Sequence, residues 1–333
     1  MKKDFDVITT GKYGGIGISV GLRSDKITIL ELMEGYPAQR QGLRVGDIIH
    51  KVDSIKVNKY NYNNLSSYLK GEPGKTVTLT IEREGIDENL LFTLQLEEIV
   101  IKNVTYFGFI PEDGNIGYIK LSGFSRSAGN EVKNALLELK KEKLISAIVL
   151  DLRGNPGGLL DQAIDVSEKF LNKSDLIVSV IGRDTTKILK YFSEETPIAN
   201  KIPLIVLIDG GSASASEIVA GSVPDHGWAV ILGTTSFGKG LVQNIRPLSY
   251  NSKLKVTVAK YYTPSGRCIQ RLDYANKNQK GEAEDISDSL ITERFKLTSP
   301  SFVNLIALSI RFVATRDSFS RSETISITLL QSK

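Results

Sequence analysis

Residues 203–223 read PLIVLIDGGSASASEIVAGSV, and this stretch decides the fold class. The apolar run Pro203–Ile208 predicts a strand buried on both faces, as strands of parallel sheets are. The small residues of Asp209–Glu217 predict a loop, and Ile218–Val223 predicts the helix that follows it. A strand, a tight loop and a helix in succession form the repeating unit of an α/β sheet.

The same alternation of strands and helices continues on both sides of this stretch. It predicts an α/β core with right-handed crossovers over residues 101–271. The other predicted strands and helices of this core are Gly117–Leu121, Ala128–Lys143 (helix), Ser146–Leu152, Leu159–Leu171 (helix), Leu176–Ile181 and Ala229–Leu232.

Residues 11–100 predict a separate, compact and β-rich unit, because short alternating strands are interrupted by only two short helices. The strand Leu90–Leu96 is apolar enough to be covered on both faces. The other elements are Lys26–Leu32, Tyr36–Leu43 (a helical turn), Val45–Val52 (a turn and a strand), Tyr62–Leu69 (helical) and Lys75–Glu82.

Composition excludes several functional classes. The 333 residues carry 42 Lys+Arg against 38 Asp+Glu, a net charge of +4 that is too small to indicate nucleic-acid binding. No apolar run reaches the length of a membrane span, and the leader, residues 1–10, has no apolar stretch of a signal peptide. Cys268 is the single cysteine, so no internal disulfide or multi-cysteine metal site is expected. We expect no metal and no cofactor.

The C-terminal region, residues 272–333, gives little signal. Its segment Asn276–Asp288 is polar and predicts a loop, whereas Ser301–Ala314 is compatible with a helix or a strand.

Ser214 is the candidate nucleophile. It lies in a small-residue loop between a strand and a helix, where helix-end N–H groups can stabilise an oxyanion. The same residues fit a capping box, in which Ser214 and Glu217 only hold the start of the helix. Considered alone, the segment favours the cap.

Lys239 shifts this balance. Its surroundings, Gly233–Gly240, nearly match a phosphate-binding loop, but Gly240 stands where that motif needs the Ser or Thr that coordinates magnesium. A lysine between two glycines can instead approach another loop, where desolvation favours the neutral amine that accepts a proton from a serine. Only His50 and His226 exist, and neither is well placed for a Ser–His pair, so a Ser–Lys dyad fits better.

A third cluster, Asp151–Gly158, also follows a buried strand and precedes a helix. Gly157 and its neighbouring glycine leave bare N–H groups that suit an oxyanion donor. We expect Asp151 and Arg153 to stabilise the turn as an ion pair.

The motifs DLRGNPGG, GSASASE, FGKGLVQ and KYYTPSG occur in the order found in carboxyl-terminal processing (tail-specific) serine peptidases, which the chain resembles over about residues 11–271. Residues 11–100 resemble the PDZ domain that precedes the core in this family. Its carboxylate-binding loop corresponds to Gly15, Ile16, Gly17 and Ile18.

The resemblance implies a crotonase-like α/β core and a location in the cell envelope. It implies that Ser214 is the nucleophile, Lys239 the general base and Gln243 the residue that orients the lysine, with an oxyanion hole formed by the amides of Gly157 and Ala215. The sequence departs from the family at Asp209, where Asn is usual, and at Pro224, which interrupts a stretch that is normally a plain helix.

The function so predicted is a serine endopeptidase that cleaves proteins near or from their C-termini. Its partners would be proteins or peptides with apolar C-termini; we expect no nucleic acid and no membrane-spanning segment, and a homo-oligomer is compatible with the resemblance. The main alternative is a non-catalytic peptide-binding scaffold with an inactive core. A nucleotide hydrolase is the third, opposed by Gly240.

Overall fold

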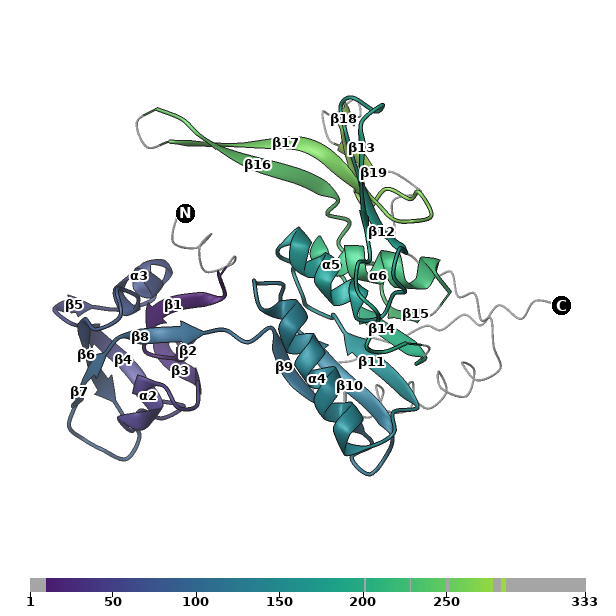
Figure 1. Cartoon of the computed structure of the whole chain (residues 1–333). Helices are drawn as coiled ribbons and strands as arrows, with labels where there is room; N and C mark the ends of the chain where they lie inside the picture. The colour runs from purple at the N-terminus through teal and green to yellow at the C-terminus, as the bar shows by residue number, and fades with distance from the viewer. Residues whose placement is uncertain (1–9, 201, 228, 250–251, 278–282, 286–333) are drawn as a thin grey trace. The chain divides into compact units, whose positions relative to one another are not determined.

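The computed structural model describes residues 10–200, 202–227, 229–249, 252–277 and 283–285 (Figure 1). The chain forms two compact units whose boundary lies between Ile101 and Lys102. The leader apart from Thr10, the helix or strand proposed for Ser301–Ala314, and the end of the C-terminal extension lie outside the described residues. No helix of the described residues combines the length and the apolar character needed to cross a membrane.

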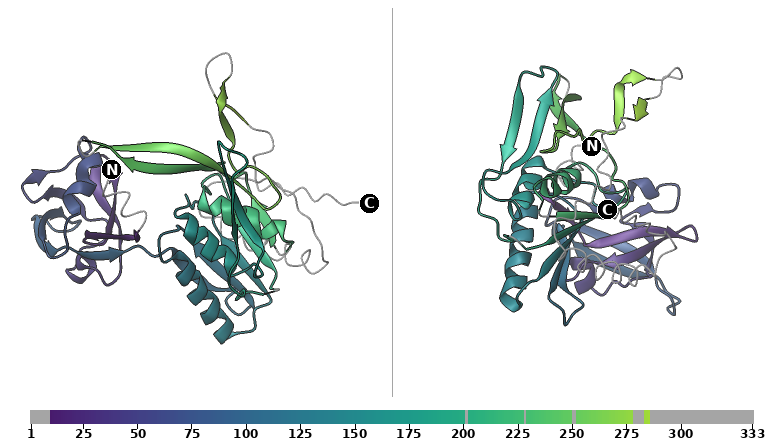
Figure 2. Two further views of the ribbon diagram at one scale, coloured as in Figure 1. Left: turned by 45° about the horizontal axis from the view of Figure 1, so that its top comes forward. Right: turned by 90° about the vertical axis from the view of Figure 1, so that its right-hand side faces the viewer.

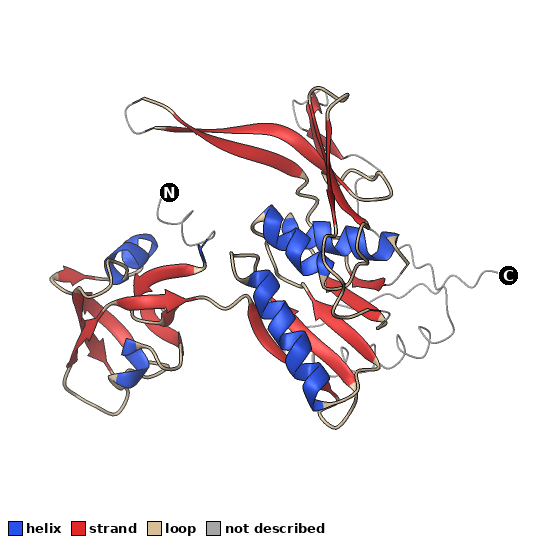
Figure 3. Ribbon diagram, viewed as in Figure 1, coloured by secondary structure: helices blue, strands red, loops and turns tan. Residues whose placement is uncertain are grey.

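In its described residues, unit 1 consists mostly of strands, with the short helical segments α2, η1 and α3 (Figure 3). Its main sheet has the order β2-β3-β4-β6-β7, with β5 paired to β4, and β1 pairs with β8 in a separate ladder. The elements are β1 (Lys12–Gly15), β2 (Ile18–Arg23), β3 (Lys26–Leu32), α2 (Pro37–Arg40), β4 (Ile48–Val52), β5 (Ile55–Lys56), η1 (Tyr62–Asn64), α3 (Leu65–Leu69), β6 (Thr76–Glu82), β7 (Leu90–Gln95) and β8 (Glu97–Val100).

Two strands of this unit show where the sequence pattern succeeds and where it fails. The strand predicted for Lys26–Leu32 is confirmed with the same limits. The prediction that Leu90–Leu96 is covered on both faces is wrong, because Leu91 is 72% exposed while Leu94 is buried. β7 lies at the edge of the sheet and packs only one face against the core, so its apolar residues alternate between core and solvent.

Unit 2 contains a five-stranded sheet with the order β15-β14-β11-β10-β9, in which β9 is antiparallel and the other four strands are parallel. The helices α4, α5 and α6 all lie on one face of this sheet (Figure 1). Its elements are β9 (Val104–Ile110), β10 (Ile116–Leu121), α4 (Ala128–Glu142), β11 (Ala147–Asp151), α5 (Leu160–Glu168), β14 (Leu204–Ile208), α6 (Ala215–Asp225) and β15 (Ala229–Gly233).

The central strands of this sheet are buried on both faces, which confirms the prediction for the PLIVLI run. In β11, Ile148 and Leu150 belong to the core cluster under the helices. The alternate residues Ala147 and Val149 belong to a second buried cluster on the opposite face. Because the parallel strands end at the same edge, the loops that follow β11, β14 and β15 come together there.

A second, antiparallel sheet of unit 2 has the order β13-β12-β17-β16. Leu176–Ile181, predicted to be a strand of the α/β core, belongs to this sheet instead; it is apolar because its residues Ile177 and Val178 are buried in the same cluster as α6. β16 and β17 run side by side as a long hairpin (Figure 2). The elements are β12 (Leu176–Gly182), β13 (Ile188–Phe192), β16 (Leu241–Pro247) and β17 (Lys253–Tyr262).

The loop predicted for Asn276–Asp288 is wrong in part. β18 (Leu272–Lys277) extends into this segment and pairs with β19 (Ala283–Asp285) in a two-stranded ladder. Hydrogen bonding between two polar strands carries no apolar periodicity, so the composition of the segment does not indicate the ladder.

Pro224 does not shorten α6. It lies in the last turn, and the helix continues to Asp225. The carboxylate of Asp225 accepts hydrogen bonds from the N–H of Ser265 and from the guanidinium of Arg267, both at 2.9 Å. The end of α6 is thereby attached to the loop that follows β17.

Candidate active site

Ser214 occupies the N-cap of α6, directly after the loop that leaves β14. Its backbone has φ 57° and ψ −110°, and a positive φ at a residue other than glycine typically costs about 1–3 kcal/mol. Such strain is concentrated at functional sites. Ser214 is half-buried, whereas Ala213 and Ala215 on either side are buried. The serine is therefore the one residue of this turn that solvent and a substrate can reach.

The carboxylate of Glu217 connects the serine loop to the lysine loop. Oε2 accepts hydrogen bonds from the N–H of Ser214 (2.7 Å) and the N–H of Lys239 (2.8 Å). Oε1 accepts from Ser236 Oγ (2.7 Å) and the N–H of Gly238 (2.6 Å). Burial raises the pKa of the Glu217 carboxyl above its ordinary value, and these four hydrogen bonds act in the opposite direction.

The bond from Ser214 is half of the predicted capping box. The three bonds to residues 236–239 were not predicted. The sequence holds no local signal for them, because they depend on two loops that meet only in the folded sheet.

Lys239 lies in the loop between β15 and β16 with its backbone held firmly and its side chain exposed. Gly240, next to it, donates its N–H to Gln270 Oε1 at 2.9 Å, and a Cβ on Gly240 would lie 2.9 Å from the Gln270 Cα. In the described part of the chain, the Lys239 ammonium forms no ion pair or hydrogen bond. The desolvation that the sequence argument invokes is therefore not present here and would have to come from a bound substrate.

Gly157 lies against the serine. Its φ is 92°, and a Cβ built on it would lie 2.8 Å from Ala215 N and 2.9 Å from Ser214 Cβ, with Ala213 O closer still. Only glycine fits this position. The N–H of Gly157 donates to Asn155 Oδ1 at 2.9 Å, so this predicted oxyanion donor is already engaged within its own loop.

Two carboxylates hold the loop that carries Gly157. Asp151, fully buried, accepts hydrogen bonds from the Arg153 guanidinium at 3.0 and 2.9 Å, which confirms the predicted ion pair. Asp209 Oδ1 accepts the N–H groups of Gly154 (2.8 Å) and Gly211 (2.9 Å). The carboxylate at position 209 thus ties this loop to the serine loop with acceptors that the usual Asn would also offer.

No hydrogen bond joins the described residues Gln243 and Lys239. It is exposed on β16, and its Nε2 donates to Thr257 Oγ1 at 3.4 Å. The even spacing of the two residues places them on one face only of a regular strand, and the ladder between β16 and β17 shifts register between Val242 and Gln243. The role expected of Gln243 stays a prediction.

One acidic group in the described residues has the spacing of metal ligands: Asp165, Glu168 and Glu195. The ammonium of Lys169 already pairs with Asp165 (2.5 Å) and with Glu195 (2.8 Å). Two of the three carboxylates therefore already have a positively charged partner within the protein.

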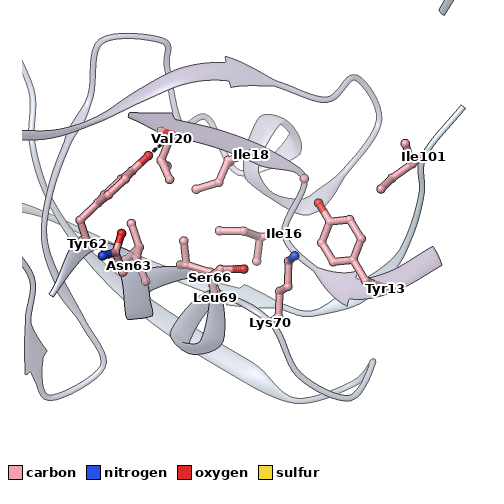
Figure 4. A pocket seen from close by; sticks show the side chains of 12 residues that line it. Tyr13, Ile16, Ile18, Val20, Tyr62, Asn63, Ser66, Leu69, Lys70 and Ile101 are labelled. Carbon is pink, nitrogen blue, oxygen red and sulfur yellow. Dashed lines mark hydrogen bonds between the residues drawn. The ribbon is translucent and has the colours of Figure 1, made fainter. Parts of the chain in front are cut away.

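Unit 1 contains a cavity of about 440 Å³ between the edge strand β2 and helix α3 (Figure 4). Three of the four residues predicted to bind a peptide, Ile16, Gly17 and Ile18, line one side of it, and Leu69 lies on the other; their role in binding stays a prediction. Gly15 does not line the cavity; it ends β1 and pairs with Glu97 of β8. Among the residues that the structure describes, β2 pairs only with β3, so its second edge is open to an added strand.

A charged side chain completes the groove. Lys70 lines the cavity next to Tyr13, and its ammonium lies 4.5 Å from the centre of the Tyr13 ring (Figure 4). The ammonium group of Lys70 can attract a carboxylate that enters the groove.

Comparison with known families assigns both units. Residues 14–94 match the model described as PDZ domain, and residues 115–276 match the model described as peptidase family S41. The core of this chain belongs to peptidase family S41.

The chain is also similar to curated proteins that are named as proteases. The chain is 41% identical over 271 residues to a carboxy-terminal-processing protease of Bartonella bacilliformis, covering 80% of this chain and 61% of that protein. It is 33% identical over 267 residues to a CtpA-like serine protease of Staphylococcus aureus strain N315, covering 80% of this chain and 52% of that protein. The chain thus spans roughly half to three-fifths of the length of these relatives.

The S41 fold is also supported by a solved structure. The crystal structure of an S41 protease from Bacteroides fragilis aligns with a TM-score of 0.52 and 18% identity, covering 78% of this chain and 73% of that one.

In the S41 core described here, the loop Gly233–Gly240 leads into strand β16 and not into a helix. This arrangement is unlike a phosphate-binding loop, which opens a helix, and it opposes the nucleotide-hydrolase alternative.

Proposed function

We propose that this chain is a serine endopeptidase that cleaves proteins near or from their C-termini, with Ser214 as nucleophile and Lys239 as general base. The observation that carries the proposal is the shared carboxylate oxygen of Glu217, which accepts the backbone N–H of both residues. The two loops are separated by helix α6 and strand β15 in the sequence, yet this oxygen holds their backbones within the span of two hydrogen bonds.

In the proposed reaction, neutral Lys239 takes the proton from Ser214 Oγ as the oxygen attacks the substrate carbonyl. The N–H of Ala215, at the start of α6, donates to the oxyanion that forms. The N–H of Gly157 serves as the second donor once it leaves Asn155 Oδ1. Protonated Lys239 then gives its proton to the leaving amine, and water hydrolyses the acyl-enzyme.

The groove of unit 1 is proposed to bind the C-terminus of the substrate. The extended peptide would add to the open edge of β2, while Ile18 and Leu69 receive apolar side chains. The terminal carboxylate would lie near the N–H groups of Ile16 and Gly17, with the Lys70 ammonium adding charge attraction. A crotonase-like relationship of the core, a cell-envelope location and a homo-oligomeric assembly belong to the same proposal.

The test is cleavage of an unfolded protein that ends in apolar residues, followed by mass spectrometry of the products. We expect the parent to cleave and Ser214→Ala and Lys239→Ala each to lose activity by at least about 10³-fold. Lys190→Ala, which removes an exposed lysine of β13, is the matched control and should retain full activity.

Two outcomes would contradict the proposal. Cleavage that survives Lys239→Ala would place the general base elsewhere. No cleavage by the parent, combined with binding of the same C-terminal peptide, would favour the non-catalytic scaffold.

A further inference from the structure

Glu217 is engaged by more donors than a helix cap needs. A capping residue accepts the N–H of the N-cap, which here is the single bond from Ser214. The other three donors, Ser236 Oγ and the N–H groups of Gly238 and Lys239, all belong to the loop that carries the lysine. Most of the hydrogen bonding of this carboxylate is therefore directed at the lysine loop.

We propose that Glu217 is the positioning residue that sets Lys239 against Ser214. The inference rests on the proposed function, since it assigns Glu217 a part in the same reaction. It acts through the backbones of the two residues and touches no substrate. Oε2 receives both N–H groups, so neither loop can shift without breaking a bond to the same atom.

The chemistry of an ionised carboxylate suits this position. Its two oxygens only accept hydrogen bonds, and all four surrounding groups donate. Glu217 is 1% exposed, so water cannot replace a lost partner. In a glutamine, the NH₂ group would face two of these donors whichever way the amide is oriented. The two hydrogen bonds on that side would then be lost.

The chain offers a matched control in Glu131. This residue also lies in the first turn of its helix, α4, and its carboxylate also accepts four hydrogen bonds, from Asn103 N, Asn103 Nδ2, Val104 N and Ser127 Oγ. None of these donors belongs to the serine or lysine loops. Glu131→Gln therefore changes a first-turn carboxylate with the same number of hydrogen bonds without touching the proposed dyad.

The experiment compares the parent chain, residues 1–333, with Glu217→Gln, Ser236→Ala and Glu131→Gln. For each, kcat and KM are measured per folded molecule, with the folded fraction taken from circular dichroism. We expect Glu217→Gln to lower kcat about 100-fold with little change in KM, as for a displacement of about 1 Å at a reacting group. Ser236→Ala removes one donor from the Oε1 side and should lower kcat by less. Glu131→Gln should keep the parental kcat.

A second readout does not depend on activity. Amide hydrogen exchange should accelerate in Glu217→Gln in both segments, 210–217 and 234–240, whereas in Glu131→Gln it should accelerate at 102–105 and leave both loops unchanged. Acceleration confined to 210–217 would reduce Glu217 to a cap and overturn the inference. So would an equal loss of kcat in Glu131→Gln. The parent could also cleave nothing while Glu217→Gln still accelerates exchange in both segments. That result would support the positioning role and contradict the proposed function.

Discussion

Replacing Gly157 by alanine tests the contact between the loop after β11 and Ser214. A Cβ at this position would lie 2.8 Å from Ala215 N and 2.9 Å from Ser214 Cβ. The first is a backbone atom, and the second is attached directly to the backbone. The clash cannot be relieved by rotating a flexible side chain, so the serine turn itself has to move.

Gly154→Ala is the control because it lies in the same loop and also has a positive φ, 70° against 92° for Gly157. A Cβ on Gly154 would meet nothing within 4 Å. Strain of about 1–2 kcal/mol from the positive φ applies to both variants, and it is offset by about 0.4–1 kcal/mol from the less flexible unfolded chain. Gly154→Ala should therefore lower the free energy of unfolding by only about 1 kcal/mol.

Gly157→Ala adds the cost of overpacking, about 1–3 kcal/mol, for a total loss of about 2–4 kcal/mol. Urea denaturation measures both losses. Displacement of Ser214 by about 1 Å should also lower the rate of cleavage about 100-fold per folded molecule, while Gly154→Ala keeps most of it. Equal losses of stability and of rate in the two variants would refute the argument that Gly157 supports the serine by direct contact.

Two further predictions concern the buried carboxylate of the core and the groove of unit 1. Burial acts to raise the pKa of Asp151, but hydrogen bonds from Arg153 and Tyr118 outweigh it and hold this pKa below its ordinary value. Because the pKa of Asp151 is lower in the folded state, its ionisation stabilises the fold above the unfolded-state pKa of about 3.9. This stabilisation is lost as the pH falls toward the folded-state pKa. The midpoints of urea unfolding at pH 6 and pH 3 should therefore differ more in the parent than in Asp151→Asn. In the groove, Ile18→Glu should weaken binding of an apolar C-terminal peptide at least about tenfold by fluorescence anisotropy, through lost apolar contact and repulsion of the carboxylate; equal loss for the same peptide with an amidated C-terminus would argue against the repulsion.

The apolar pattern of the sequence predicts a strand correctly where the burial of that strand depends on its own sheet alone. β3 and the fully buried β14 have apolar patterns that match their surroundings, and the structure has them where the sequence indicates. β12 is equally apolar but belongs to another sheet, because an apolar run indicates burial and not the partner strand. β7 has one exposed face for a similar reason: whether another layer covers a face of a strand depends on packing that is remote in sequence.

The candidate site divides in the same way. Ser214 and Gly157 follow from loops at the ends of parallel strands, and the structure brings them into contact. The lysine loop is brought to the serine loop by Glu217, whose local pattern indicates only a helix cap. Gln243 could not be placed from spacing, because one irregular step in the ladder changes which side of the hairpin a residue faces.

Helix α6 has a carboxylate near each end, and these two side chains bind the two ends of the β16–β17 hairpin. Glu217 binds residues 236–239, where the chain enters β16, and Asp225 binds Ser265 and Arg267, where it has left β17. The 11-residue helix is about 16 Å long and is hydrogen-bonded near both ends to the segments that flank the hairpin. Both ends of the hairpin are thus attached to α6, and the attachment at the start of β16 is made at the helix end that carries Ser214.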